Sequence, residues 1–148
     1  MKKLITMISI TALAILSGCS ILGEVNNTLE YANTATGYIG TAQRFAEEIP
    51  GLAEKAVTST EAAQNLENEL QAMKQEIAAF NKTDAPAIAK DIHNQIVGAN
   101  KKLEAGIDSY LENVENGKLD PAFLEDSQIL KTISELNTLV NQIESLGN

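Results

Sequence analysis

The residue in the most specific sequence context for chemistry is Cys19, the only cysteine in the chain. After two lysines near the start, residues 4–16 form a mostly apolar run, and the small residues Ser17 and Gly18 then precede the cysteine. The run has the length of the hydrophobic region of a secretory signal and is too short to span a bilayer, which takes roughly 20 helical residues. A lone thiol cannot form an intramolecular disulfide. Its position therefore indicates covalent modification at the end of a signal peptide.

The four residues Leu16, Ser17, Gly18 and Cys19 resemble a bacterial lipobox. The resemblance implies transfer of a diacylglyceryl group to the Cys19 sulfur, giving a thioether that carries palmitate-type chains, and cleavage between Gly18 and Cys19. One acyl chain binds a membrane only marginally, and stable anchoring needs two signals. Because a diacylglyceryl group has two chains, we expect the mature protein to stay attached to the membrane without spanning it.

No second group in the chain has a comparable context for chemistry. The single histidine, His93, follows Lys90 by three residues, whereas di-iron bundles need Glu-x-x-His motifs. We expect His93 at the surface or at the edge of a groove. With Cys19 lipidated, no Cys-His or Ser-His-Asp arrangement remains, and no Gly-rich phosphate loop follows a strand. The 20 acidic residues offer many pairs for glycoside chemistry, but on amphipathic helices we expect them to be solvated. We predict no catalytic residue, no metal and no cofactor.

Composition limits the classes of partner. The net charge is −9, and removal of the signal peptide, which carries two lysines and no acid, leaves −11. Such a protein is repelled by nucleic acid and by anionic surfaces unless it has a local basic patch. Lys101-Lys102 is the only basic pair after the signal. We therefore predict no binding to nucleic acid.

The first half of the mature chain predicts two helices. Apolar residues recur with helical spacing from Glu24 to Ile49, where Pro50-Gly51 is expected to stop the helix, and 52–57 is expected to make one or two turns. The capping hydroxyls of 58–60 then precede a second helix that reaches about Asn81. The apolar stripe of this second helix steps by 4, 3, 4 and 3 residues through Leu66, Leu70, Met73, Ile77 and Phe80.

The second half predicts two more helices. Asp84 is a candidate N-cap with Pro86 in the first turn, and Asn116-Gly117 is the expected end of the third helix. Gly98 and Gly106 lie inside it, marking close helix contacts, a bend or a cleft. Asp120-Pro121 repeats the cap-plus-proline signal for a fourth helix that ends near Gly147.

The sequence thus predicts an all-α protein in three regions: a signal peptide (1–18), a lipidated tether (19–23) and a helical domain (24–148). Few aromatic residues and no period-two pattern exclude a β-sandwich or a two-lobed α/β solute-binding protein. Helices with short connections favour an antiparallel, up-down four-helix bundle. A three-helix bundle with the first helix as a stalk is the alternative.

Three aromatic residues recur every seven positions on the first helix: Tyr31, Tyr38 and Phe45. This stripe has two interpretations, a docking surface for a partner and an ordinary part of the core. If it is core, replacement of Tyr38 by alanine should cost several kcal/mol.

Beyond the lipobox, the segments Gly23–Asn27, Glu47–Pro50, Asp84–Pro86 and Leu119–Pro121 resemble those of a family of small, uncharacterised lipoproteins of spore-forming Gram-positive bacteria. The resemblance implies a lipid-anchored protein on the extracytoplasmic face of the cell membrane; in a Gram-negative host it would imply the outer membrane. It implies no activity.

Two functions remain. The first is a non-enzymatic helical module that engages another extracytoplasmic protein or envelope component. The alternative is a lipoprotein that binds a small molecule or peptide between its helices.

Overall fold

The computed structural model describes residues 18–115 and 120–147, and within these ranges the chain is helical without a strand. Its elements are α1 (Gly18–Ala56), α2 (Thr60–Phe80), the 3-10 helix η1 (Ala87–Ala89), α3 (Lys90–Glu115), α4 (Ala122–Asp126), α5 (Ile129–Asn137), α6 (Val140–Glu144) and the 3-10 helix η2 (Ser145–Gly147). The all-α prediction is confirmed. The predicted signal residues 1–17 and the predicted end of the third helix at Asn116-Gly117 lie outside the described residues.

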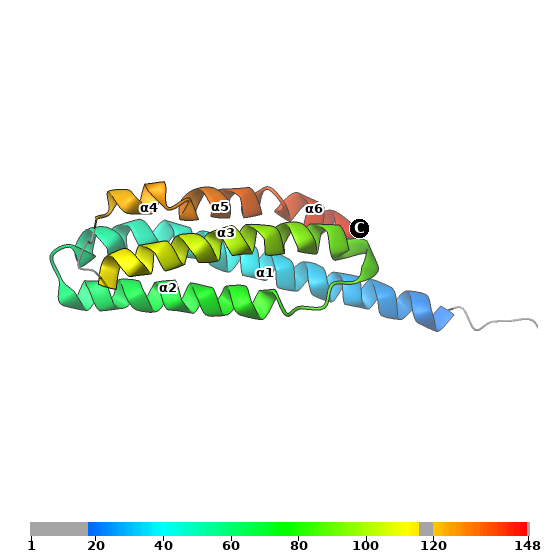
Figure 1. The fold of residues 1–148 in the computed structure, drawn as a ribbon. Helices are drawn as coiled ribbons and strands as arrows, with labels where there is room; N and C mark the ends of the chain where they lie inside the picture. Colours follow the sequence, from blue (N-terminus) through cyan, green and yellow to red (C-terminus); the bar gives the residue numbers. More distant parts are fainter. Residues whose placement is uncertain (1–17, 116–119, 148) are drawn as a thin grey trace, which may run out of the picture.

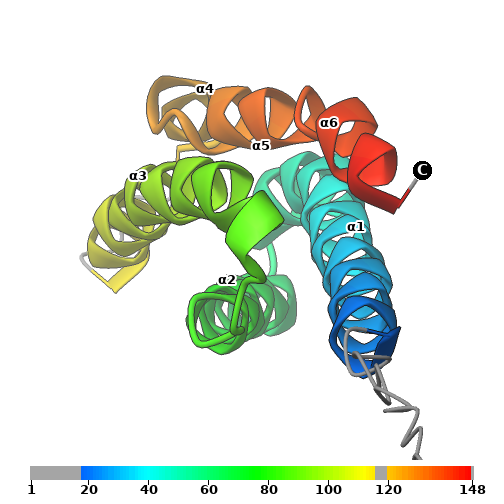
Figure 2. The same ribbon diagram turned by 90° about the vertical axis from the view of Figure 1, so that its right-hand side faces the viewer.

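The long helices run side by side, and successive ones point in opposite directions (Figure 1). The short helices α4 to α6 follow one another back toward the start of α1. Viewed from the end, they lie on one side of α1 and α3, and α2 lies on the other (Figure 2). The interior is closed by packing of α1 against α2, α5 and α6, and of α3 against α2 and α5.

Helix α2 matches the sequence prediction closely. Ser59 has an extended backbone, and its Oγ accepts a hydrogen bond from the Ala62 amide at 3.2 Å, which satisfies one of the free N–H groups of the first turn. The five residues of the predicted stripe, Leu66 to Phe80 in steps of 4, 3, 4 and 3, are all buried. Both signals are local, so the sequence alone was sufficient to place this helix.

The predicted end of the first helix at Pro50 is wrong, because α1 continues through this proline to Ala56. A proline inside a helix removes one backbone hydrogen bond and costs about 3 kcal/mol. The residues that follow explain why the helix continues: Ala53 and Ala56 extend the buried stripe of Ile49 by steps of 4 and 3, and all three are at most 3% exposed. Burial of this stripe in the core favours continuation of the helix despite the loss at Pro50. At its other end α1 begins at Gly18 rather than at Glu24.

The predicted start of the third helix is also displaced. Asp84 does not cap a helix; instead η1 follows Pro86, the Ala89 amide donates to the Pro86 carbonyl, and α3 begins only at Lys90. Asp120 does act as predicted, since its Oδ1 accepts from the Ala122 amide at 2.9 Å at the start of α4.

The predicted single fourth helix is replaced by α4, α5 and α6. The break between α4 and α5 lies at Gln128, whose φ of 62° is in the left-handed region that residues other than glycine rarely adopt. Gly106 of α3 faces this junction: a Cβ there would lie 2.6 Å from the Ser127 carbonyl oxygen and 3.1 Å from Ile129 Cγ1. Gly106 thus marks a close helix contact, which was one of the predicted alternatives. Gly98 is exposed, and no atom lies within 4 Å of where its Cβ would be. Neither glycine opens a cleft.

These two glycines provide a matched test of the junction. Gly98→Ala should stabilise the protein by up to about 1 kcal/mol, because alanine has the higher helix propensity and the site is open. Gly106→Ala should destabilise it by roughly 1–3 kcal/mol despite the same propensity gain, because the added methyl overlaps a backbone carbonyl. Urea denaturation of both variants measures the two changes. Equal stabilisation by both would contradict the close contact.

Candidate functional site

The aromatic stripe of α1 lies in the interior of the molecule. Tyr31, Tyr38 and Phe45 are 2%, 6% and 7% exposed, so their rings present little surface to a partner. This burial favours the core interpretation over the docking surface.

Two of these rings form a cluster with α2 and α3. The ring of Tyr38 stacks on Phe80 with centroids 4.5 Å apart, and Tyr31 lies 6.5 Å from Phe80. His93 of α3 completes the cluster, with its ring 5.9 Å from Tyr31 and 5.4 Å from Phe80. His93 Nδ1 and the Tyr31 hydroxyl are 3.2 Å apart and share a hydrogen bond. His93 is therefore half-buried and held by aromatic neighbours, rather than placed beside a nucleophile.

A buried amide lies next to this cluster. The Tyr38 hydroxyl donates to Asn100 Oδ1 at 2.5 Å, and Asn100 Nδ2 donates to Asn81 Oδ1 at 2.8 Å. Asn100 is fully buried, so these bonds satisfy polar groups that would otherwise cost about 1–3 kcal/mol each. The network joins α1, α3 and the end of α2, and its chemistry is structural, since its members bond one another.

Sequence reasoning missed Asn100, although a signal was present. Asn100 is four residues after Ile96 and three before Leu103, so it occupies a core position of the α3 stripe. An amide in such a position requires a buried partner. The partner, Tyr38, is 62 residues away in the chain, and only the folded structure brings the two together.

Burial raises the pKa of every tyrosine in the chain. The pKa of Tyr31 is raised to about 12 by loss of solvation. Burial also raises the pKa of Tyr38, with a smaller opposing effect from the Asn100 hydrogen bond, and that of Tyr110, where the Asp120 carboxylate adds to the effect.

The contribution of the tyrosines to stability should therefore be lost at alkaline pH. The unfolded chain ionises its tyrosines near pH ~10, below the folded pKa values, so the tyrosines' contribution is complete below pH ~10 and is lost as the pH rises toward 12. Tyrosinate absorbance is a clean measurement because the chain has three tyrosines and no tryptophan. We expect the tyrosines to ionise well above pH ~10 in buffer, and near pH ~10 in urea, where the chain is unfolded. Ionisation near pH ~10 with an intact helical circular dichroism spectrum would contradict this.

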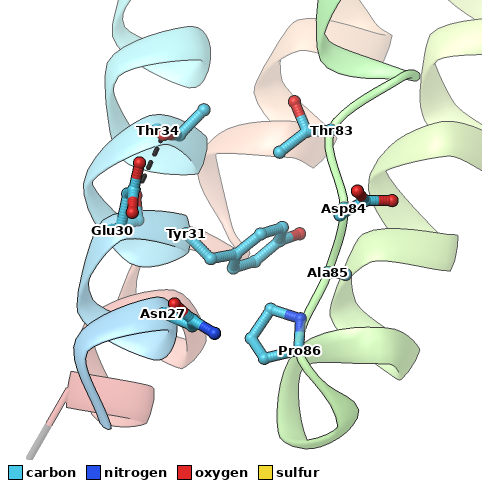
Figure 3. A pocket seen from close by; sticks show the side chains of 8 residues that line it. All are labelled: Asn27, Glu30, Tyr31, Thr34, Thr83, Asp84, Ala85 and Pro86. Atoms are coloured by element: carbon cyan, nitrogen blue, oxygen red, sulfur yellow. Dashed lines mark hydrogen bonds between the residues drawn. The ribbon is translucent and has the colours of Figure 1, made fainter. Parts of the chain in front are cut away.

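A groove lies beside the aromatic cluster, between α1 and the connection from α2 to η1 (Figure 3). Its volume is about 510 Å³, and Tyr31 reaches across from α1 toward the connection, where Asp84 and Pro86 lie opposite. Glu30 and Asp84 are the two exposed acidic residues of the lining, although the Asp84 carboxylate points away from Tyr31 (Figure 3), and no lysine or arginine is among the lining residues. The full lining is Asn27, Glu30, Tyr31, Thr34, Thr83, Asp84, Ala85 and Pro86.

The predicted anchor residues lie at the edge of the described chain. Leu16 and Ser17 are outside the described residues, and Gly18 and Cys19 are the first two residues of α1. Across residues 18–115 and 120–147, no helix combines the length and the apolar character that a membrane crossing requires. Within those same ranges, no three His, Cys, Asp or Glu residues are placed to bind one metal ion.

Two comparisons relate the chain to known proteins, whereas no solved structure matches it. It is 36% identical over 147 residues to the "Uncharacterized lipoprotein YybP" of Bacillus subtilis (strain 168), and the match covers 99% of each chain. Residues 31–146 match the model of a family of unknown function, DUF6376, a range that begins at Tyr31 and includes the aromatic cluster and the buried amide network. The chain therefore belongs to the family DUF6376.

Proposed function

We propose that the protein is a lipoprotein held on the extracytoplasmic face of the cell membrane by a diacylglyceryl group on Cys19, after cleavage between Gly18 and Cys19. The observation that carries this proposal is the lipobox-like Leu16-Ser17-Gly18-Cys19 at the end of a signal-like run. The relative from Bacillus subtilis, itself called a lipoprotein, supports it because the match extends over nearly the whole chain.

The position of Cys19 in α1 links the proposed anchor directly to the folded body. Cys19 is the second residue of α1, and α1 packs directly against α2, α5 and α6. A lipid on Cys19 would thus be joined to the folded body through one continuous helix. We interpret the body as an antiparallel bundle in which α4 to α6 together take the place of a fourth helix.

The helical domain is, in this proposal, a non-enzymatic interaction or structural module of the cell envelope whose partner is another extracytoplasmic protein. Support comes from the polar groups of its interior: Tyr38, Asn100 and Asn81 bond one another, and His93 is bonded to Tyr31. This arrangement fixes the relative positions of α1, α2 and α3 and offers a stable surface for contact.

Proximity labelling tests the interaction. A labelling enzyme fused to the C-terminus of the anchored protein should mark a small, reproducible set of extracytoplasmic proteins on intact cells. The control is the same fusion secreted without a lipid through a signal lacking the lipobox. Recovery of one specific neighbour by the anchored form would support the module. Identical, unspecific labelling by both forms would count against it.

The groove beside Tyr31 favours a second candidate function, binding of a small molecule or peptide. Its volume of about 510 Å³ is in the range of ligand sites. The acidic lining residues Glu30 and Asp84 and the lack of basic ones favour a cationic or neutral ligand over an anion. Thermal shift with short lysine-containing and glutamate-containing peptides tests this candidate. Stabilisation by the lysine peptide that is lost in Glu30→Gln would support it, and no shift with either peptide would remove it.

A further inference from the structure

Exposed apolar side chains gather at one end of the described molecule. Four large apolar residues are substantially exposed: Val25 (51%), Leu29 (42%), Val57 (51%) and Ile88 (63%). Val25 and Leu29 are one turn apart near the start of α1, and Ile88 belongs to η1, whose connection lies at the same end (Figure 1). Val57 follows α1 at the opposite end.

The first turns of α1 extend beyond the rest of the body (Figure 1). Val25 and Leu29 are exposed on this part of α1, whereas Thr28 and Tyr31 on the same helix are buried. Isolated exposed apolar residues are common. A pair on one helical face near a membrane attachment point, however, can be covered by the lipid surface.

Charge along the first half of α1 is low for so acidic a chain. Between residues 18 and 43 the charged residues are Glu24 and Glu30, whereas 21% of the whole chain is charged. The exposed neighbours Asn26, Asn27 and Asn33 are neutral and able to hydrogen-bond. A zwitterionic lipid surface, which carries no net charge, does not repel these two carboxylates.

Distance from the anchor decides which surface can cover the pair. With a rise of 1.5 Å per residue, Val25 is about 9 Å and Leu29 about 15 Å along the helix from Cys19. Acyl chains on Cys19 would enter the hydrocarbon region, which places the cysteine at the boundary. The headgroup layer of one leaflet is roughly 5–8 Å thick, so a start of α1 that is tilted toward the membrane brings Val25 into this layer and Leu29 to its outer edge.

We propose that the start of α1, around Val25 and Leu29, lies in the headgroup region of the membrane that holds Cys19. The contact rests on the proposed lipid anchor and adds to it a second, non-covalent interaction with the lipid surface. It directs the far end of the molecule, with Val57, away from the membrane.

Single labelled cysteines test this placement. The lipid occupies the only native thiol, so Val25→Cys, Leu29→Cys and Val57→Cys each give one free thiol for an environment-sensitive fluorophore. The lipidated variants are reconstituted into phosphatidylcholine vesicles containing spin-labelled lipid as the quencher. Val57 is a matched control, because it is the same residue type as Val25, equally exposed, and roughly 48 Å further along α1.

We expect quenching at least several-fold stronger at position 25 than at position 57, with position 29 between them. Equal, weak quenching at 25 and 57 would overturn the proposal, and equal, strong quenching would overturn it by showing a molecule that lies flat. Blue-shifted fluorescence from the probe at position 25 without quenching by lipid would show that a protein partner or a second copy, rather than the membrane, covers Val25 and Leu29. Protein that fails to float with the vesicles would reject the anchor itself, whereas floating protein with an unquenched probe at 25 would reject only this contact.

Discussion

Replacing Cys19 with serine will leave the protein as an uncleaved precursor that carries no lipid. The diacylglyceryl group forms a thioether, so its transfer requires the sulfur of Cys19 as the nucleophile. A serine hydroxyl is a far weaker nucleophile than a thiolate at neutral pH, and no other cysteine can substitute for it. We therefore expect complete loss of modification rather than a partial decrease.

Two measurements report this loss. Metabolic labelling with radioactive palmitate should mark the native protein and decrease to background in Cys19→Ser. Intact mass should show that the variant retains residues 1–18, whereas the native protein begins at a lipidated Cys19. Ser20→Ala is the matched control, because it changes the adjacent hydroxyl residue and should be labelled and cleaved normally. A Cys19→Ser variant that matures and is labelled like the native protein would refute the anchor.

Replacing Tyr38 with alanine will destabilise the domain by about 3–5 kcal/mol. The ring is 6% exposed and stacked on Phe80, so its removal leaves a cavity in the interior. The hydroxyl is the donor to the buried Asn100 Oδ1, which would lose its partner. A domain of ordinary stability, about 5–15 kcal/mol, would lose a large fraction of its free energy of unfolding.

A second substitution separates the ring from the hydroxyl. Tyr38→Phe keeps the stack on Phe80 and removes only the hydrogen bond to Asn100, so we expect a loss of roughly 1–2 kcal/mol. Asn33→Ala, at an exposed position of the same helix, should change stability by less than about 0.5 kcal/mol. Urea denaturation measures all three variants. If Tyr38→Ala melts like the native protein, the residue contributes nothing to the core and the docking interpretation of the stripe returns.

Features set by neighbouring residues were predictable from the sequence. The start of α2 depends on Ser59 and the amide three residues later, and its buried face depends on spacing alone. The start of α4 depends likewise on Asp120 and Ala122. The anchor predicted at Cys19 is of the same kind, because its context is a run of consecutive residues. No folding is needed to form it.

Features set by distant residues were not predictable. Pro50 is a strong local signal to end a helix, yet α1 continues through it, and Ala53 and Ala56 beyond it are buried in the core. The break at Gln128 in the predicted fourth helix is not marked in the sequence by a glycine or a proline at this position. It lies where the α4–α5 junction approaches the bare backbone of Gly106.

The same distinction applies to the candidate sites. The sequence by itself determined the all-α class and the regularly spaced apolar faces of α1 and α2, because each depends on residue type and local order. Only the tertiary structure decided that Tyr31 and Tyr38 are interior, that Asn100 is the buried partner of Tyr38, and that Val25 and Leu29 remain exposed. The reason is physical, because burial and hydrogen bonds between residues 62 apart in the chain arise only when the helices pack together. Helical periodicity identifies the apolar face of a helix but not the element that packs against it.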